Sequence, residues 1–93
     1  MIRIAICDDE KKILDEVEGY IKNYAEKEND LDLEVFRFDS ARTLIGAIED
    51  GKSFDIFVLD VYIGDEMGTA LASDIRKFGI ESPIIFATTS LEH

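Results

Sequence analysis

Hydrophobic residues along the chain alternate between a spacing typical of β-strands and a spacing typical of helices. Short apolar or alternating runs predict four strands, within residues 2–7, 31–40, 54–60 and 82–90. Between them, apolar residues recur every three or four positions, which predicts three helices, within residues 11–29, 40–51 and 68–80. The pattern places one apolar face on the first helix, formed by Ile13, Leu14, Val17, Ile21 and Tyr24. Ser40 is a candidate N-cap of the second helix, and Gly51 is its candidate stop.

This order of strands and helices predicts an α/β fold with a doubly wound parallel sheet. Parallel strands joined through helices need right-handed crossovers, which place helices on both faces of the sheet. The run 54–60 is apolar nearly throughout, as a strand covered on both faces should be. In such sheets ligands bind beyond the carboxyl ends of the strands, where the strand order reverses. The residues that end the strands are therefore the candidates for a site.

Carboxylates end two of the predicted strands. Asp8 and Asp9, followed by Glu10, end the first strand, and Asp60 ends the third. If these strands are neighbours, as in the common order 2-1-3-4, the aspartates converge on one rim and need a counter-ion. Their hard oxygens suit Mg²⁺, and a carboxylate beside such a metal can act as the nucleophile that accepts a phosphoryl group. Thr88, which ends the fourth strand, would bring a hydroxyl within reach of a group on Asp60.

Each acid also has a simpler interpretation. Asp9 could cap the first helix while Glu10 complements its dipole, and Asp60 could begin a polar loop. Ser90 could cap a following helix. Because acids follow apolar runs at two separate strand ends, the shared site is the better explanation.

Composition and charge narrow the class of protein and its partners. The chain has 93 residues, enough for one domain, and 46% of them are hydrophobic. With 21 acidic against 10 basic residues the net charge is −11, so we expect no direct binding to nucleic acid or to anionic membranes. No apolar stretch approaches the length of a membrane span, no signal peptide precedes the first strand, and Cys7 has no disulfide partner, which favours the cytoplasm. We expect Cys7 to be buried as a small hydrophobe, and Tyr20 and Tyr24 to serve helix packing and not to form a binding stripe.

Three stretches resemble the receiver domain of two-component response regulators. They are "ICDDE" (6–10), "FVLDVYIGDEMG" (57–68) and "PIIFATTS" (83–90), and the resemblance covers essentially the whole chain. It implies a flavodoxin-like fold with Asp60 as phosphoacceptor, Asp8 and Asp9 as Mg²⁺ ligands together with Asp60, and a metal contact from the backbone carbonyl of Tyr62. It also implies Thr88 as the switch hydroxyl, a sensor histidine kinase as phosphodonor, and control of transcription through an output domain. The stretch "VYIGDEMG", which lacks the proline usual after the phosphoacceptor, is similar to receivers that precede LytTR-type DNA-binding domains.

The sequence departs from a complete receiver after the fourth strand. Such domains continue with a helix, a fifth strand that ends in a lysine, and a last helix, and no residue here is the equivalent of that lysine. We therefore expect an incomplete receiver over residues 1–90, with 91–93 either a vector-derived remnant or the start of a fourth helix. The fourth strand would then be an open edge at Ile84, Ile85 and Phe86, which favours self-association.

Three functions are compatible with these residues. The first is a phosphoacceptor receiver that is not an enzyme. The second is a phosphatase-like enzyme with Asp60 as nucleophile, although such enzymes commonly place an acid two residues later, where this chain has Tyr62. The third is a receiver that is not phosphorylated and serves only as an interaction module, which the absence of the lysine favours.

Overall fold

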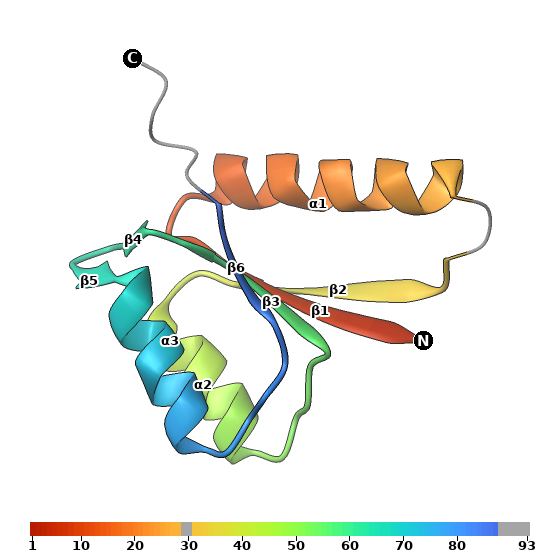
Figure 1. Ribbon diagram of the computed structural model, residues 1–93. Helices are drawn as coiled ribbons and strands as arrows, with labels where there is room; N and C mark the ends of the chain where they lie inside the picture. Colours follow the sequence, from red (N-terminus) through yellow and green to blue (C-terminus); the bar gives the residue numbers. More distant parts are fainter. Residues whose placement is uncertain (29–30, 88–93) are drawn as a thin grey trace.

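A four-stranded parallel sheet lies between two helical layers in the computed structural model, which describes residues 1–28 and 31–87 (Figure 1). The strand order is β2-β1-β3-β6, so the predicted order 2-1-3-4 and the predicted fold class are confirmed. The strands of this sheet are β1 (Ile2–Cys7), β2 (Leu33–Phe38), β3 (Ile56–Asp60) and β6 (Ile84–Ala87). Three helices connect them, α1 (Lys11–Lys27), α2 (Ala41–Glu49) and α3 (Gly68–Lys77). Thr88, Ser90 and residues 91–93 lie outside the described residues.

The two faces of the sheet are covered unequally. Helices α2 and α3 lie on one face, and α1 alone lies on the other (Figure 1). Because side chains alternate along a strand, β1 sends Ala5 and Cys7 toward α2 and α3, and Ile4 and Ile6 toward α1. The core on the α2–α3 side is the larger, and it includes Phe57 and other side chains with little or no exposure. Cys7 is buried there as predicted.

The ends of the helices follow from local hydrogen bonds. Ser40 caps α2 as predicted, because its hydroxyl oxygen accepts a hydrogen bond from the Thr43 N–H at 3.1 Å. The turn after α2 passes through Gly51, whose φ of 93° is a conformation that favours glycine. Asp9 is not the cap of α1, whose N-cap residue is Glu10 and has no side-chain capping bond.

Tyr20 and Tyr24, which were expected to serve helix packing, are mostly exposed. Their side chains are 75% and 60% exposed, because the sheet contacts the neighbouring helical face formed by Leu14, Val17 and Ile21. The two tyrosines instead line the open side of an apolar groove of about 420 Å³ between α1 and the sheet. The floor of this groove includes side chains of all four strands, among them Ile4, Leu33, Val58 and Ile85.

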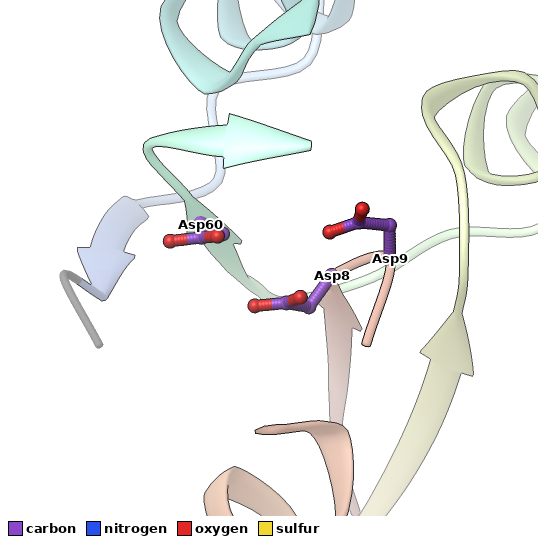
Figure 2. A group of neighbouring side chains, drawn as sticks. All are labelled: Asp8, Asp9 and Asp60. Atoms are coloured by element: carbon purple, nitrogen blue, oxygen red, sulfur yellow. The ribbon is translucent and has the colours of Figure 1, made fainter. Parts of the chain in front are cut away.

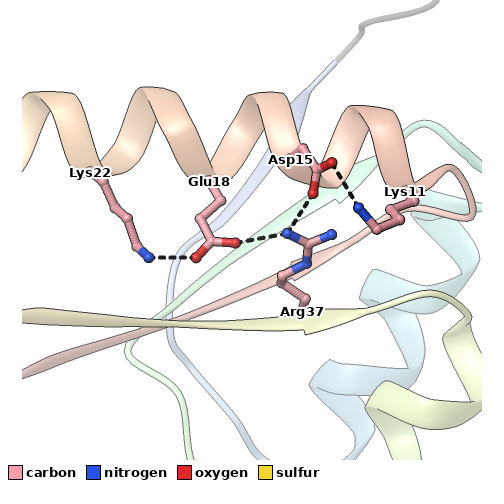
Figure 3. A network of polar contacts seen from close by, with 5 residues as sticks. All are labelled: Lys11, Asp15, Glu18, Lys22 and Arg37. Carbon is pink, nitrogen blue, oxygen red and sulfur yellow. Dashed lines mark hydrogen bonds and ion pairs between the residues drawn. The ribbon is translucent and has the colours of Figure 1, made fainter.

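Ion pairs tie α1 to the outer strand β2. The Arg37 guanidinium lies 2.7 Å from a carboxylate oxygen of Asp15 and 2.9 Å from one of Glu18 (Figure 3). Lys11 pairs with the same aspartate at 3.0 Å, and Lys22 pairs with the same glutamate at 2.7 Å. These contacts hold the pKa of the Asp15 and Glu18 carboxyl groups below their ordinary values. No helix among the described residues combines the length and the apolar character needed to cross a membrane.

Candidate functional site

Asp8, Asp9 and Asp60 meet at the carboxyl ends of two adjacent strands. The parallel pairing of β1 with β3 ends at Cys7 and Leu59, so the next residue of each strand is an aspartate and the two lie side by side. Asp9 follows in the loop that leads to α1 (Figure 2). One carboxylate oxygen from each of the three residues lies within 4.8 Å of the others. The strand order therefore brings together the carboxylates that the sequence placed at strand ends.

Asp8 is the buried member of this cluster and the one buried charged residue in the described part of the chain, with 4% exposure. Asp60 is half-buried and Asp9 is exposed. Burial raises the pKa of the Asp8 carboxyl to about 6, and the charges of Asp60 and Asp9 add to the increase, while a hydrogen bond from the Glu10 N–H opposes it. Burial and the same acids raise the pKa of the neighbouring Cys7 thiol to about 12. The cluster thus concentrates negative charge where water solvates it poorly.

No cationic side chain in the described ranges forms an ion pair with these carboxylates. A buried carboxylate next to two others is unfavourable unless a positive charge compensates it. The donor set consists only of oxygens, which a hard cation such as Mg²⁺ prefers. The residues therefore fit a divalent cation of that type.

Asp60 is held by the segment that follows it. Its Oδ1 accepts a hydrogen bond from the Val61 N–H at 2.9 Å. Two short strands, β4 (Tyr62–Ile63) and β5 (Glu66–Met67), then form a hairpin that returns the chain to the end of β3. The hairpin was not predicted, although a Gly-Asp pair between apolar residues is a known signal for such a turn. Gly64, with φ of 62°, provides the turn.

The register of this hairpin determines which backbone groups it uses. The Gly68 N–H donates to the Val61 carbonyl at 2.5 Å, so Val61 and Gly68 face each other as a hydrogen-bonded pair. Hydrogen-bonded and non-hydrogen-bonded pairs alternate along antiparallel strands, so the next pair, Tyr62 and Met67, exchanges no backbone hydrogen bonds. The hairpin therefore does not use the Tyr62 carbonyl as a hydrogen-bond acceptor. The Tyr62 side chain is 58% exposed, and that of Met67 is 46% exposed.

The remaining candidate, Thr88, lies outside the described residues. The last described residue, Ala87, pairs with Asp60 in the sheet. Strand β6 therefore ends, at Ala87, beside the acidic cluster.

Comparison with known proteins identifies the family. The family model for the response regulator receiver domain matches residues 4–93. The transcriptional regulatory protein CitT of Bacillus subtilis (strain 168) is 32% identical over 96 aligned positions, which cover 99% of this chain and 38% of CitT. The chain thus spans about two fifths of the length of this curated relative. A solved structure, the MaeR response regulator bound to beryllium trifluoride, has a TM-score of 0.72 and 22% identity over 99% of this chain and 70% of its own, so it shows a shared fold.

Proposed function

The chain belongs to the response regulator receiver domain family, and we propose that it is a phosphoacceptor module in which Asp60 receives a phosphoryl group. The observation that carries this proposal is the convergence of Asp8, Asp9 and Asp60 at the carboxyl ends of β1 and β3. Open parallel sheets of this type bind ligands at the carboxyl ends of their strands. The module acts by changing its own surface after phosphorylation and not by turning over a product.

In the proposed reaction, a carboxylate oxygen of Asp60 attacks the phosphorus of a phosphorylated donor. The bond between phosphorus and the leaving group of the donor breaks, and an acyl phosphate remains on Asp60. The Val61 N–H, which donates to Asp60 Oδ1, keeps the side chain oriented. Asp8, Asp9, Asp60 and the Tyr62 carbonyl would hold Mg²⁺, which when bound neutralises the charge of the phosphoryl group. Thr88 is the proposed switch hydroxyl, and its hydrogen bond to the phosphoryl group would report phosphorylation.

The proposed donor is the phosphohistidine of a sensor histidine kinase. The output is proposed to be control of transcription, which is consistent with the similarity to the transcriptional regulatory protein CitT, and the proposed location is the cytoplasm. With a net charge of −11, this segment is not expected to contact nucleic acid itself. Membership of the LytTR-coupled subgroup stays a prediction.

The test is incubation with acetyl phosphate and Mg²⁺, followed by mass spectrometry of the intact protein and of its peptides. We expect the wild type to gain the mass of one phosphoryl group on Asp60, and Asp60→Asn or excess chelator to prevent it. Asp65→Asn is the matched control, because Asp65 is an exposed acid in the turn of the β4–β5 hairpin, outside the cluster. A wild type that binds Mg²⁺ but is never labelled would identify an interaction module that is not phosphorylated.

A phosphatase-like enzyme is the weaker candidate. Such an enzyme needs an acid that protonates the leaving group, and two residues after Asp60 the chain has Tyr62. Release of inorganic phosphate from a panel of phosphate monoesters, abolished by Asp60→Asn, would favour this alternative over the receiver.

We also propose that two copies of the chain associate with each other through strand β6. Strand β6 forms one edge of the described sheet, and its Ile85 and Phe86 side chains are 52% and 39% exposed. An apolar edge strand presents unpaired backbone groups to another strand, so two copies can pair there.

A further inference from the structure

Gly68 lies directly against the backbone of the proposed phosphoacceptor. It is the first residue of α3 and is buried, and its N–H donates to the Val61 carbonyl at 2.5 Å. A Cβ atom added at Gly68 would overlap the carbonyl oxygen of Asp60 and would lie 3.3 Å from Cε1 of Phe86. The start of α3 is therefore packed against the peptide unit that joins Asp60 to Val61.

The requirement for glycine at this position is one of space. The positive φ angles among the glycines occur at Gly51, Gly64 and Gly79, where backbone conformation favours the residue and no atom lies within 4 Å of an added Cβ. The helical residues Gly19 and Gly46 also have open space around them. Of the six glycines, Gly68 alone stands where a side chain would collide with the backbone.

We propose that Gly68 is a positioning residue for Asp60, an inference that rests on the proposed function of that carboxylate. The Gly68 N–H holds the Val61 carbonyl, and the Val61 N–H in turn holds Asp60 Oδ1. The bare Cα of Gly68 lets α3 approach closely enough to form this connection. A side chain at position 68 would push the Asp60–Val61 peptide away from α3 and turn the Asp60 carboxylate away from Asp8 and Asp9.

The experiment compares Gly68→Ala with Gly19→Ala. Gly19 is exposed in α1, and alanine there replaces a helical glycine in open space, so we expect unchanged metal binding and equal or higher stability. In Gly68→Ala we expect Mg²⁺ affinity, measured by titration of the ion alone, to fall about 10- to 100-fold, the range typical for residues that orient metal ligands. We also expect the amide resonance of Val61 to shift in Gly68→Ala and to stay in place in Gly19→Ala. Unchanged Mg²⁺ affinity and an unchanged Val61 resonance in Gly68→Ala would overturn the inference.

Two further variants separate positioning from a general loss of stability. In the first, Gly68→Ala is combined with Gly19→Ala and Gly46→Ala, which raise helix propensity where nothing obstructs a methyl group. If affinity returns to the wild-type value once stability is restored, Gly68 serves the fold alone and the inference is wrong. In the second, Gly68→Ala is combined with Phe86→Ala, which removes the side chain that lies nearest to the new methyl group among the described residues. We expect no recovery there, because the Asp60 carbonyl remains in place, and recovery would contradict the assigned cause.

The two measurements on Gly68→Ala test the positioning role of Gly68 separately from the phosphoacceptor role of Asp60. Mg²⁺ affinity and the Val61 resonance require no phosphoryl transfer. A wild type that is never labelled by acetyl phosphate would refute the phosphoacceptor role, while these two measurements would still decide whether Gly68 positions Asp60.

Discussion

At the scale of single residues, the acidic cluster explains why a carboxylate lies at the end of a hydrophobic strand. Asp8 follows the buried run of β1, and its pKa is raised first by burial of the carboxyl group and then by the charges of Asp60 and Asp9. A bound divalent cation reverses this cost, because it favours the ionised carboxylates. Burial also weakens screening by water, so the carboxylates attract a bound cation more strongly than they would at an exposed site.

We expect Asp9→Asn to weaken Mg²⁺ binding by on the order of tenfold or more, because it removes one full negative charge from the ligand set while leaving an oxygen in place. Isothermal titration of the variant and of the wild type measures the difference, and Asp65→Asn serves as a charge-matched control. Unchanged affinity in a protein with asparagine at both positions 9 and 60 would place the metal elsewhere.

The thiol of Cys7 should be protected from reagents in the folded protein. Its side chain is 2% exposed in the core between β1 and α2, and its sulfur lies 3.4 Å from the Ser40 carbonyl. We expect slow alkylation by iodoacetamide in buffer and rapid alkylation in urea, followed by mass spectrometry. Equal rates in the two conditions would mean that β1 opens readily.

At the scale of secondary-structure elements, the sequence was informative wherever apolar periodicity was long. The four sheet strands and three helices were predicted because each buries a face that the spacing of apolar residues reveals. The β4–β5 hairpin escaped prediction because its two-residue strands are too short to show a period. Tyr20 and Tyr24 were misplaced because helical spacing identifies an apolar face but does not show how much of it a neighbouring sheet covers.

The same limit applies to the site. The positions of Asp8, Asp9 and Asp60 could be predicted, because parallel pairing delivers strand ends to one edge. The close packing of Gly68 could not, since it depends on a tertiary contact that no local pattern records.

Ser40→Ala should destabilise the protein by about 1 kcal/mol, the usual cost of losing an N-cap side chain. The variant removes the acceptor for the Thr43 N–H at the start of α2. Urea denaturation measures the free energy of unfolding, and Ser73→Ala, at an exposed position of α3, is the control that we expect to be neutral or slightly stabilising. Equal values for the two variants would show that the cap contributes nothing.

Arg37→Gln should lower the stability of the connection between α1 and β2 through the loss of two ion pairs. The carboxyl groups of Asp15 and Glu18 have folded-state pKa values below their ordinary values of 3.8 and 4.5, so their contribution is present above those values and is lost as the pH falls through the lowered ones. The stability difference between wild type and variant should therefore shrink both in acid and at high salt.

Denaturation at several pH values and salt concentrations tests this expectation. Arg42→Gln is the control, because Arg42 is exposed on α2 and forms no ion pair with the residues that the structure describes. A difference for Arg37→Gln that is independent of salt would assign the effect to packing of the arginine stem and not to its charge.

At the scale of the whole molecule, the uneven covering of the sheet is the main feature. Two helices cover one face and one helix covers the other, which leaves the groove beside Tyr20 and Tyr24 and the edge strand β6 exposed. Both are apolar, although the net charge of −11 opposes contact between copies. Association should therefore strengthen as salt screens this repulsion.

We expect dimers at high micromolar concentration in analytical ultracentrifugation, and we expect Ile85→Lys to abolish them, because a charge on an edge strand opposes pairing with another strand. Phe78→Lys is the control, since Phe78 is similarly exposed but is the C-cap residue of α3 and not part of the edge strand. A wild type that stays monomeric at that concentration, with β6 protected in hydrogen exchange, would contradict this expectation.

The central position of β1 also has a consequence for the order of events during synthesis. This strand leaves the ribosome before its two neighbours in the sheet, β2 and β3, which come from residues 33–38 and 56–60. When only β1 and β2 have left the ribosome, the nascent chain carries Asp8 and Asp9, but one side of β1 still lacks its neighbouring strand β3. The third aspartate arrives with the strand that fills this gap. Metal affinity should therefore appear late and abruptly in a series of lengthening nascent chains, at the step where β3 docks.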